Sequence, residues 1–222
     1  ERAIAITLSE DNYIRHMPVE MFRVQNRGGK GLKGVATKNE DTPQLIVTCF
    51  SKDRLLIFTD KGRVYGLKAW ETPLASRHAR GSHIRNVIEK IQDDENIVTI
   101  LPISRDLLES PDGHFLLFAT RLGLIKKTKL EEYVRINRNG KYALRFKLDN
   151  DSLVNVRTGT NESAVVMISS TGFASRFACS DIRSSGRVSA GVYGIKTGNR
   201  KNADGGHVVA MMSTENTDTQ IL

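Results

Sequence analysis

Short apolar runs alternate with tight polar turns along the whole chain. Four of these runs occupy residues 3–6, 55–58, 115–118 and 164–168. Each run leads into a turn that contains Gly or Asn, the residues that best tolerate positive φ, and a second apolar run follows the turn. This pattern predicts a β-hairpin at each of the four places, and little helical periodicity competes with it.

The four hairpins recur at a regular interval. Their turn residues are 50, 61 and 49 residues apart, at Asn12, Gly62, Gly123 and Gly172. The longer interval contains a polar, turn-rich insertion at residues 104–113. Fifteen residues after each turn residue comes an arginine, at Arg27, Arg77, Arg138 and Arg187. Nineteen residues after the turn residue, the first, second and fourth units have a glycine, at Gly31, Gly81 and Gly191. The third unit has Tyr142 at this position. These shared offsets indicate four copies of one unit.

The repeat predicts the architecture. The units have boundaries near 1–53, 54–113, 114–162 and 163–215, and residues 220–222 look like the first strand of a fifth unit. One small sheet cannot bury both of its faces alone, so units of about 50 residues are expected to pack as the blades of a propeller. We therefore expect an all-β fold in which residues 1–222 form one domain or a fragment of one. The four arginines would lie at equivalent places on its rim.

The charge of the chain favours an anionic partner. There are 33 Lys and Arg against 25 Asp and Glu, which gives a net charge of +8. The third unit carries most of this excess, with 10 cations and 5 anions, and the first two units are nearly neutral. Many solvated surfaces are also basic without binding anything. We predict that Lys126, Lys127 and Lys129 are exposed, so that reversing their charges weakens binding to DNA and leaves the fold intact.

Residues 25–31, with the sequence Gln-Asn-Arg-Gly-Gly-Lys-Gly, contain no apolar side chain. Three glycines let another surface approach the backbone closely, while Arg27 and Lys30 place fixed charge beside exposed N–H groups. This combination suits a polyanion such as the phosphate backbone of DNA. The alternative is a basic surface turn without a ligand.

Enzyme motifs find little support. Gly29, Gly31 and Gly34 match a dinucleotide-binding spacing, but residues 35–41 do not read as the helix that this motif must open. Gly31 also stands where a Walker loop needs Ser or Thr to hold magnesium. We therefore predict no catalytic residue and no cofactor in this chain.

Metal sites and membrane spans are likewise not predicted. The five histidines are scattered, and Cys49 and Cys179 lack a Cys-x-x-Cys spacing, which favours reduced, buried thiols in a cytosolic protein. No apolar run approaches the roughly 18 residues of a membrane span. Trp70 is expected to pack in the core or between blades.

The whole chain resembles the C-terminal domain of the DNA gyrase A subunit. That family carries a box of pattern Gln-Arg-Arg-Gly-Gly-(Arg/Lys)-Gly in its first blade. Asn26 replaces the first Arg of the box, and the other positions match through Gln25, Arg27, Gly28, Gly29, Lys30 and Gly31. Residues 59–73 of the second unit are also similar to the family.

The resemblance implies a β-pinwheel, which is a propeller-like disc whose blades exchange strands. Its basic rim would wrap duplex DNA so that gyrase can introduce negative supercoils. The implied partners are duplex DNA, the rest of the gyrase A subunit and, through that subunit, the gyrase B subunit. The resemblance also implies a cytoplasmic protein that is associated with the nucleoid and has no membrane partner. Family domains have about six blades, so four units and a strand indicate a truncated chain or a short variant.

Two alternatives remain open. The first is the C-terminal domain of topoisomerase IV, a relative that lacks an intact box. The second is a propeller that acts as a scaffold for other proteins. The predicted DNA-binding residues are Gln25, Arg27, Gly28, Gly29, Lys30, Gly31, Lys33, Arg77, Arg80, Lys126, Lys127, Lys129, Arg138, Lys141 and Arg187.

Overall fold

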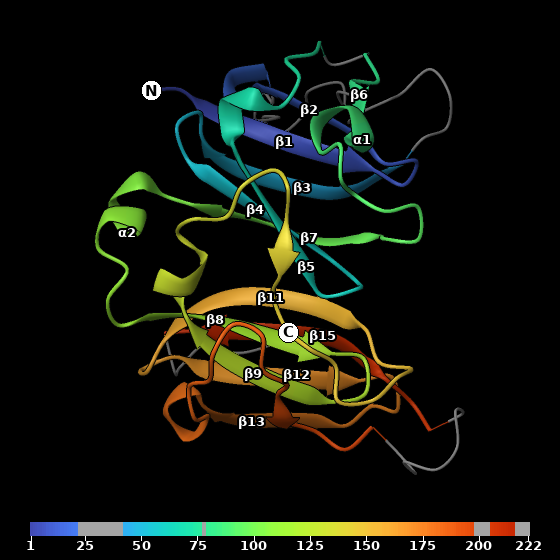
Figure 1. Cartoon of the computed structure of the whole chain (residues 1–222), viewed down its shortest axis with the longest axis vertical. Helices are drawn as coiled ribbons and strands as arrows, with labels where there is room; N and C mark the ends of the chain where they lie inside the picture. The colour runs from blue at the N-terminus through green and yellow to red at the C-terminus, as the bar shows by residue number, and fades with distance from the viewer. Residues whose placement is uncertain (22–41, 77–78, 198–204, 216–222) are drawn as a thin grey trace, which may run out of the picture.

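Four antiparallel sheets follow one another along the longest axis of the molecule, from blue to red in Figure 1. The structure is a computed structural model that describes residues 1–21, 42–76, 79–197 and 205–215. Each sheet is one blade, and most of its strands come from one of the predicted units. The predicted start of a fifth unit at 220–222 lies outside the described residues.

The strand order is the same in the first three blades. The first blade contains, in spatial order, β3 (Pro43–Phe50), β1 (Ala3–Ser9), β2 (Tyr13–Pro18) and β6 (Ser82–His83). The second contains β7 (Ile97–Ile103), β4 (Arg54–Thr59), β5 (Arg63–Lys68) and β10 (Lys141–Tyr142). The third contains β11 (Leu153–Thr160), β8 (His114–Thr120), β9 (Leu124–Lys129) and β14 (Val192–Tyr193). The fourth contains β15 (Val208–Thr214), β12 (Ala164–Ser169) and β13 (Ala174–Ala178).

Helices are short and lie between strands. The two α-helices of the described residues are α1 (Ile84–Val87) and α2 (Arg105–Glu109), and α2 occupies the insertion predicted in the second unit. Each hairpin is followed by one turn of 3-10 helix; these turns are η1 (Val19–Met21), η2 (Ala69–Glu71), η3 (Leu130–Tyr133) and η4 (Cys179–Asp181).

Neighbouring blades exchange strands. The short strands β6, β10 and β14 belong to the second, third and fourth units, yet each pairs with the blade before its own. In Figure 1, β10 is the short yellow arrow next to the label of β5. At the opposite edge of the blades, β3, β7, β11 and β15 contact one another in turn. The exchanged strands therefore lie at the outer rim. The predicted all-β, propeller-like fold with exchanged strands is confirmed.

The hairpin turns have the predicted backbone conformation. The φ angle is 63° at Asn12, 75° at Gly62, 93° at Gly123 and 82° at Gly172. Such positive angles favour Gly and, among other residues, Asn. The two strands on either side of each turn pair antiparallel, as β1 with β2 and β4 with β5.

The apolar core lies between the blades. In β4, Leu55 and Ile57 face the first blade, whereas Leu56 and Phe58 face the third. Successive strand residues point to opposite faces, so one continuous apolar run supplies two cores. All four side chains are fully buried, and each contributes about 1.5–3 kcal/mol by leaving water. The middle strands thus explain why the repeat shows unbroken apolar runs rather than alternation.

The register explains the one exception among the repeated glycines. Strand β10 begins at Lys141, so its preceding residue is Gly140, just as Gly81 precedes β6 and Gly191 precedes β14. A Cβ on Gly81 would lie 2.5 Å from Ile14 O, and one on Gly140 would lie 2.4 Å from the Tyr65 ring. The third unit is two residues shorter before this strand, so its glycine has an offset of seventeen rather than nineteen.

Replacing the glycine that precedes an exchanged strand by alanine is expected to weaken the packing of that strand on the preceding blade. A Cβ on Gly191 would lie 2.4 Å from Ile125 O, and a main-chain atom cannot move aside cheaply. We expect Gly191→Ala to lower the free energy of unfolding by about 1–3 kcal/mol. Gly186→Ala is the matched control, because a Cβ there meets nothing within 4 Å. Denaturant unfolding of both variants checks this, and equal stabilities would contradict it.

Candidate nucleic-acid interface

Three segments form the outer rim of the described blades. We define the exchanged segments as residues 74–83, of which 74–76 and 79–83 are described, residues 136–142 and residues 184–193. Their near ends bind the preceding blade through Ala75 N to His16 O (3.1 Å), Gly66 N to Asn137 O (3.2 Å) and Ser185 N to Lys127 O (2.9 Å). Just beyond their far ends, Ile84, Ala143 and Gly194 donate to the turn residues of that blade. Each segment is therefore fixed at two points.

Arg138 and Arg187 occupy exchanged segments at successive junctions between blades. The Arg138 guanidinium lies 3.2 Å from the Glu71 carboxylate, and its side chain is 52% exposed. The main-chain N–H of Arg187 donates to Glu132 Oε2 at 2.6 Å, while its guanidinium donates to Tyr142 O at 2.6 Å. Glu71 and Glu132 both lie nine residues after their turn glycine, so the two junctions place an acid beside the arginine of the next unit.

Two further predicted cations lie on the exchanged segments. Arg80 forms an ion pair with Asp11 and lies over the Tyr13 ring, with its Cζ 3.8 Å from the ring centroid. Lys141 is exposed, and its ammonium group donates to Arg135 O at 3.3 Å. Both segments thus present positive charge at the rim.

Lys126 does not reach the surface, which corrects the prediction that it is an exposed DNA contact. Its side chain is 2% exposed, and Nζ donates to Ala143 O at 2.7 Å and to Arg187 O. The ammonium group also lies 4.9 Å from the Phe118 ring centroid. Burial lowers the pKa of Lys126 to about 7, against the opposing effect of Glu132.

Lys127 is also buried, at 4% exposure, and is likewise not an exposed DNA contact. Its Nζ donates to Asn161 Oδ1 and to Cys179 O, both at 2.8 Å, and lies 4.5 Å from the Phe115 ring centroid. Both lysines lie on β9, which has a blade on each face, so alternate side chains enter two different cores. Lys129, at the end of β9, is exposed as predicted and pairs with Glu131 at 3.4 Å.

Trp70 is exposed rather than buried, which corrects the expectation that it packs between blades. It lies in η2 with 55% of its surface exposed, and Lys68 Nζ is 5.9 Å from its ring centroid. Its main-chain N–H donates to Ser51 O at 3.0 Å. Of the two cysteines, Cys179 is buried and Cys49 is half-buried, and both are free thiols.

Aromatic residues at the rim were missed in the sequence. The second residue of β6, β10 and β14 is His83, Tyr142 and Tyr193, respectively. Tyr142 lies near Arg63 and Tyr193 near Lys147, with the cationic atom 5.7 and 5.6 Å from the ring centroid. The shorter third unit hides this equivalence, because the offsets from the turn residue differ by two. Aligning the units on the glycines before these strands, Gly81, Gly140 and Gly191, would have shown that His83, Tyr142 and Tyr193 are equivalent.

The remaining predicted DNA-binding residues lie outside the described residues. They are Gln25, Arg27, Gly28, Gly29, Lys30, Gly31, Lys33 and Arg77.

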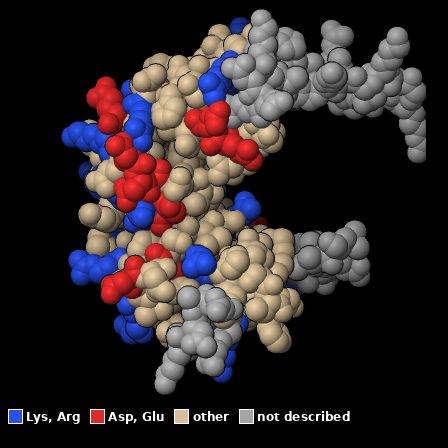
Figure 2. All heavy atoms as spheres, turned by 90° about the vertical axis from the view of Figure 1, so that its right-hand side faces the viewer, with Lys and Arg blue, Asp and Glu red and all other residues tan. Residues whose placement is uncertain are grey.

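Cations and carboxylates lie side by side on the surface. Figure 2 shows blue and red side chains mixed along one edge of the molecule instead of a continuous basic stripe. Ion pairs such as Arg138 with Glu71 and Lys129 with Glu131 place opposite charges next to each other. Exposed pairs of this kind are worth about 0–1 kcal/mol, so a phosphate group can displace the carboxylate at small cost.

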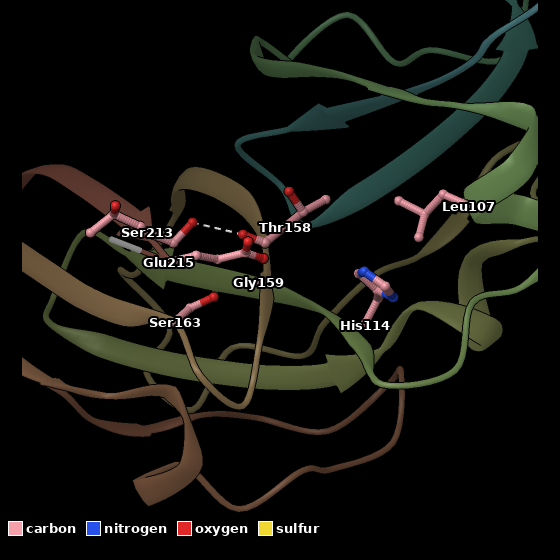
Figure 3. A pocket seen from close by; sticks show the side chains of 8 residues that line it. Leu107, His114, Thr158, Gly159, Ser163, Ser213 and Glu215 are labelled. Carbon is pink, nitrogen blue, oxygen red and sulfur yellow. Dashed lines mark hydrogen bonds between the residues drawn. The ribbon is translucent and has the colours of Figure 1, made fainter. Parts of the chain in front are cut away.

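A pocket of about 350 Å³ between the third and fourth blades is a less suitable site for an anion (Figure 3). Its described lining includes His114, Thr158, Ser213 and Glu215 but no Lys or Arg. Ser213 donates to Thr158 O at 2.7 Å, and His114 Nδ1 lies 3.1 Å from Asp112 O, so these groups already have main-chain partners.

Neither a membrane-spanning helix nor a metal cluster is found in the part of the chain that the structure describes. No helix there is long and apolar enough to cross a membrane. No group of three or more His, Cys, Asp or Glu residues there is placed to hold a metal ion.

Comparisons with known proteins identify the family. The model of the DNA gyrase C-terminal domain, a β-propeller, matches residues 4–42, 53–104, 114–158 and 164–215. The chain is 43% identical over 195 residues to the DNA gyrase A subunit from Staphylococcus epidermidis (strain ATCC 12228 / FDA PCI 1200) and to that from Staphylococcus aureus (strain MRSA252). These alignments cover 88% of this chain and 21% of each relative, so the chain spans about a fifth of their length.

Two solved structures share the fold of this chain. The C-terminal domain of DNA topoisomerase IV is similar with a TM-score of 0.71 and 25% identity, over 97% of this chain and 62% of that one. The DNA gyrase A C-terminal domain has a TM-score of 0.72 and 23% identity, over 95% of this chain and 64% of that one. The exchanged strands, the repeat and the family match lead to one conclusion: this chain belongs to the DNA gyrase C-terminal domain family.

Proposed function

We propose that this chain binds duplex DNA along its outer rim and wraps it, without catalysing a reaction itself. The wrapped DNA would serve a DNA gyrase that introduces negative supercoils, with the rest of the gyrase A subunit, together with the B subunit, as partners. The observation that carries this proposal is the recurrence of an arginine on the exchanged segments, at Arg138 and Arg187.

Repeated contacts are what bending of DNA requires. Duplex DNA has a persistence length of about 150 base pairs, and curving a site through 40–90° costs on the order of 1–6 kcal/mol. Cations at successive junctions between blades can offset this cost step by step. The nearly intact box at residues 25–31 favours gyrase over topoisomerase IV, in agreement with the gyrase relatives at 43% identity.

The proposal predicts that the affinity for duplex DNA falls steeply as the salt concentration rises, and that the cations of the exchanged segments cause much of this dependence. Each phosphate contact contributes about 0.9 to the slope of log affinity against log salt concentration. Replacing Arg138, Lys141 and Arg187 together by alanine should therefore lower the slope by up to about 2.7. Fluorescence anisotropy with a labelled duplex over a series of NaCl concentrations measures this slope.

The matched control removes three exposed cations away from the exchanged segments. Arg2→Ala, Arg105→Ala and Arg157→Ala change the net charge by the same amount, and each side chain is exposed. We expect this control to keep nearly the whole slope. Equal losses in the two triple variants would show that net charge and not the rim governs binding. A wild-type chain that fails to bind DNA at low salt would favour a protein-binding propeller.

A further inference from the structure

A buried arginine of the first blade holds the main chain of the first exchanged segment. Arg15 is 2% exposed and lies on β2. Its Nη1 donates to Ser76 O at 3.1 Å and also to Ala79 O, while Nε donates to Thr7 Oγ1 at 3.2 Å. Ser76 and Ala79 lie on either side of Arg77 in the sequence.

A different residue makes the same kind of contact at the next junction. Tyr65 occupies the position equivalent to Arg15, three residues after the turn residue, but it does not make this contact. Its hydroxyl instead lies 2.9 Å from the Glu95 carboxylate. The cation comes instead from β4, where Arg54 Nη2 donates to Ile136 O. Ile136 is two residues before Arg138.

Lys126 makes this contact at the third junction. It again lies three residues after the turn glycine, and its Nζ donates to the carbonyl oxygen of Arg187 itself. A second bond to Ala143 O, at 2.7 Å, joins it to the residue that directly follows the preceding exchanged segment. Lys126 thus connects the third exchanged segment to the end of the second.

All three contacts have a common physical effect. A main-chain carbonyl of a rim loop would otherwise bind water, whereas here it accepts from the side chain of Arg15, Arg54 or Lys126. The hydrogen bonds from the two arginines are charge-assisted and therefore stronger than neutral ones. The donor is fixed in a blade, so the loop loses conformational freedom before any ligand arrives. A loop that is already ordered loses less entropy when it binds, which increases affinity.

We propose that Arg15, Arg54 and Lys126 are positioning residues for DNA binding: they fix the exchanged segments so that the rim arginines meet phosphates in one geometry. This inference rests on the proposed function. Exposed cations would bind phosphates directly. These three cations would instead hold the main chain of the exchanged segments and would not touch DNA.

The test is a double-mutant cycle between Lys126 and Arg187. Lys126→Met keeps most of the buried volume and removes the donor. If the Arg187 contact is lost, affinity for a labelled duplex should fall by about 15-fold at 50 mM NaCl and by about 4-fold at 200 mM, as one missing phosphate contact predicts. Arg187→Ala should give the same losses, and adding Lys126→Met to it should cause no further loss.

Lys127→Met is the matched control for stability. Lys127 is equally buried and adjacent, but its partners Asn161 and Cys179 lie outside the exchanged segments. This variant should lose stability in thermal unfolding and keep the wild-type salt slope. A wild-type slope in Lys126→Met, or losses that add in the double variant, would overturn the proposal.

A second measurement does not depend on DNA. Trypsin should cleave after Arg187 at least several times faster in Lys126→Met than in wild type or Lys127→Met, because the loop is released. Unchanged cleavage would refute the anchoring. Faster cleavage of Lys126→Met, together with a wild-type chain that binds no DNA, would refute only the proposed function. If Lys126→Met does not fold, Arg54→Met with Arg138→Ala supplies the same cycle at the preceding junction.

Discussion

Reversing the charge of Lys126 is expected to lower the free energy of unfolding by about 3–5 kcal/mol, a large share of the 5–15 kcal/mol typical of a domain. In Lys126→Glu, a carboxylate would face the carbonyl oxygens of Ala143 and Arg187, which now accept from Nζ. The nearby Glu132 would repel it as well. The buried carboxylate and the two carbonyl oxygens would then all lack a hydrogen-bond donor.

The same loss is expected for Lys127→Glu and not for Lys129→Glu. Lys127 Nζ satisfies Asn161 and Cys179 in a buried site, whereas Lys129 is exposed and its pair with Glu131 is worth about 1 kcal/mol at most. Urea unfolding of the three single variants measures the difference. Three equal and small losses would mean that the buried lysines can reach water after all.

These lysines show where reasoning from sequence was insufficient. The run Lys126-Lys127-Thr128-Lys129 reads as a solvated basic patch, because lysine is rarely buried. Whether it reaches water depends on what covers the strand, and β9 is enclosed by the blades on either side. The partners of the lysines are 17 to 61 residues away in sequence, so no local pattern reveals them.

The fold was more accessible than the site. Turn chemistry and apolar runs are local signals, and they predicted the hairpins at Asn12, Gly62, Gly123 and Gly172 together with the repeat. The exchange of strands came only from the family resemblance, because β6, β10 and β14 are two residues long and carry no periodic signal. The shorter third unit then concealed both Gly140 and Tyr142 from alignment by fixed offset.

The box at residues 25–31 is expected to separate binding of DNA from wrapping. Curved DNA needs a contact that fixes the end of its path, and Arg27 and Lys30 combine paired cations with glycine-rich backbone. Replacing residues 25–31 by alanine should leave much of the binding in a gel shift, because under the proposed function the other rim cations would still contact phosphates. It should remove the DNA bend measured by energy transfer between labelled ends. In the full-length enzyme, supercoiling should be abolished and relaxation kept.

The glycine replacements could unfold the first blade, so the decisive variant is Arg27→Ala with Lys30→Ala. It removes two charges and leaves every glycine in place. Two lost phosphate contacts lower the salt slope by only about 1.8, so binding at low salt should persist. The bend should still disappear, because the elastic cost of curvature, on the order of 1–6 kcal/mol, then lacks its terminal contact. If this double variant bends DNA and supports supercoiling as the wild type does, residues 25–31 are a basic turn, and the wrapping must be fixed by the exchanged segments alone.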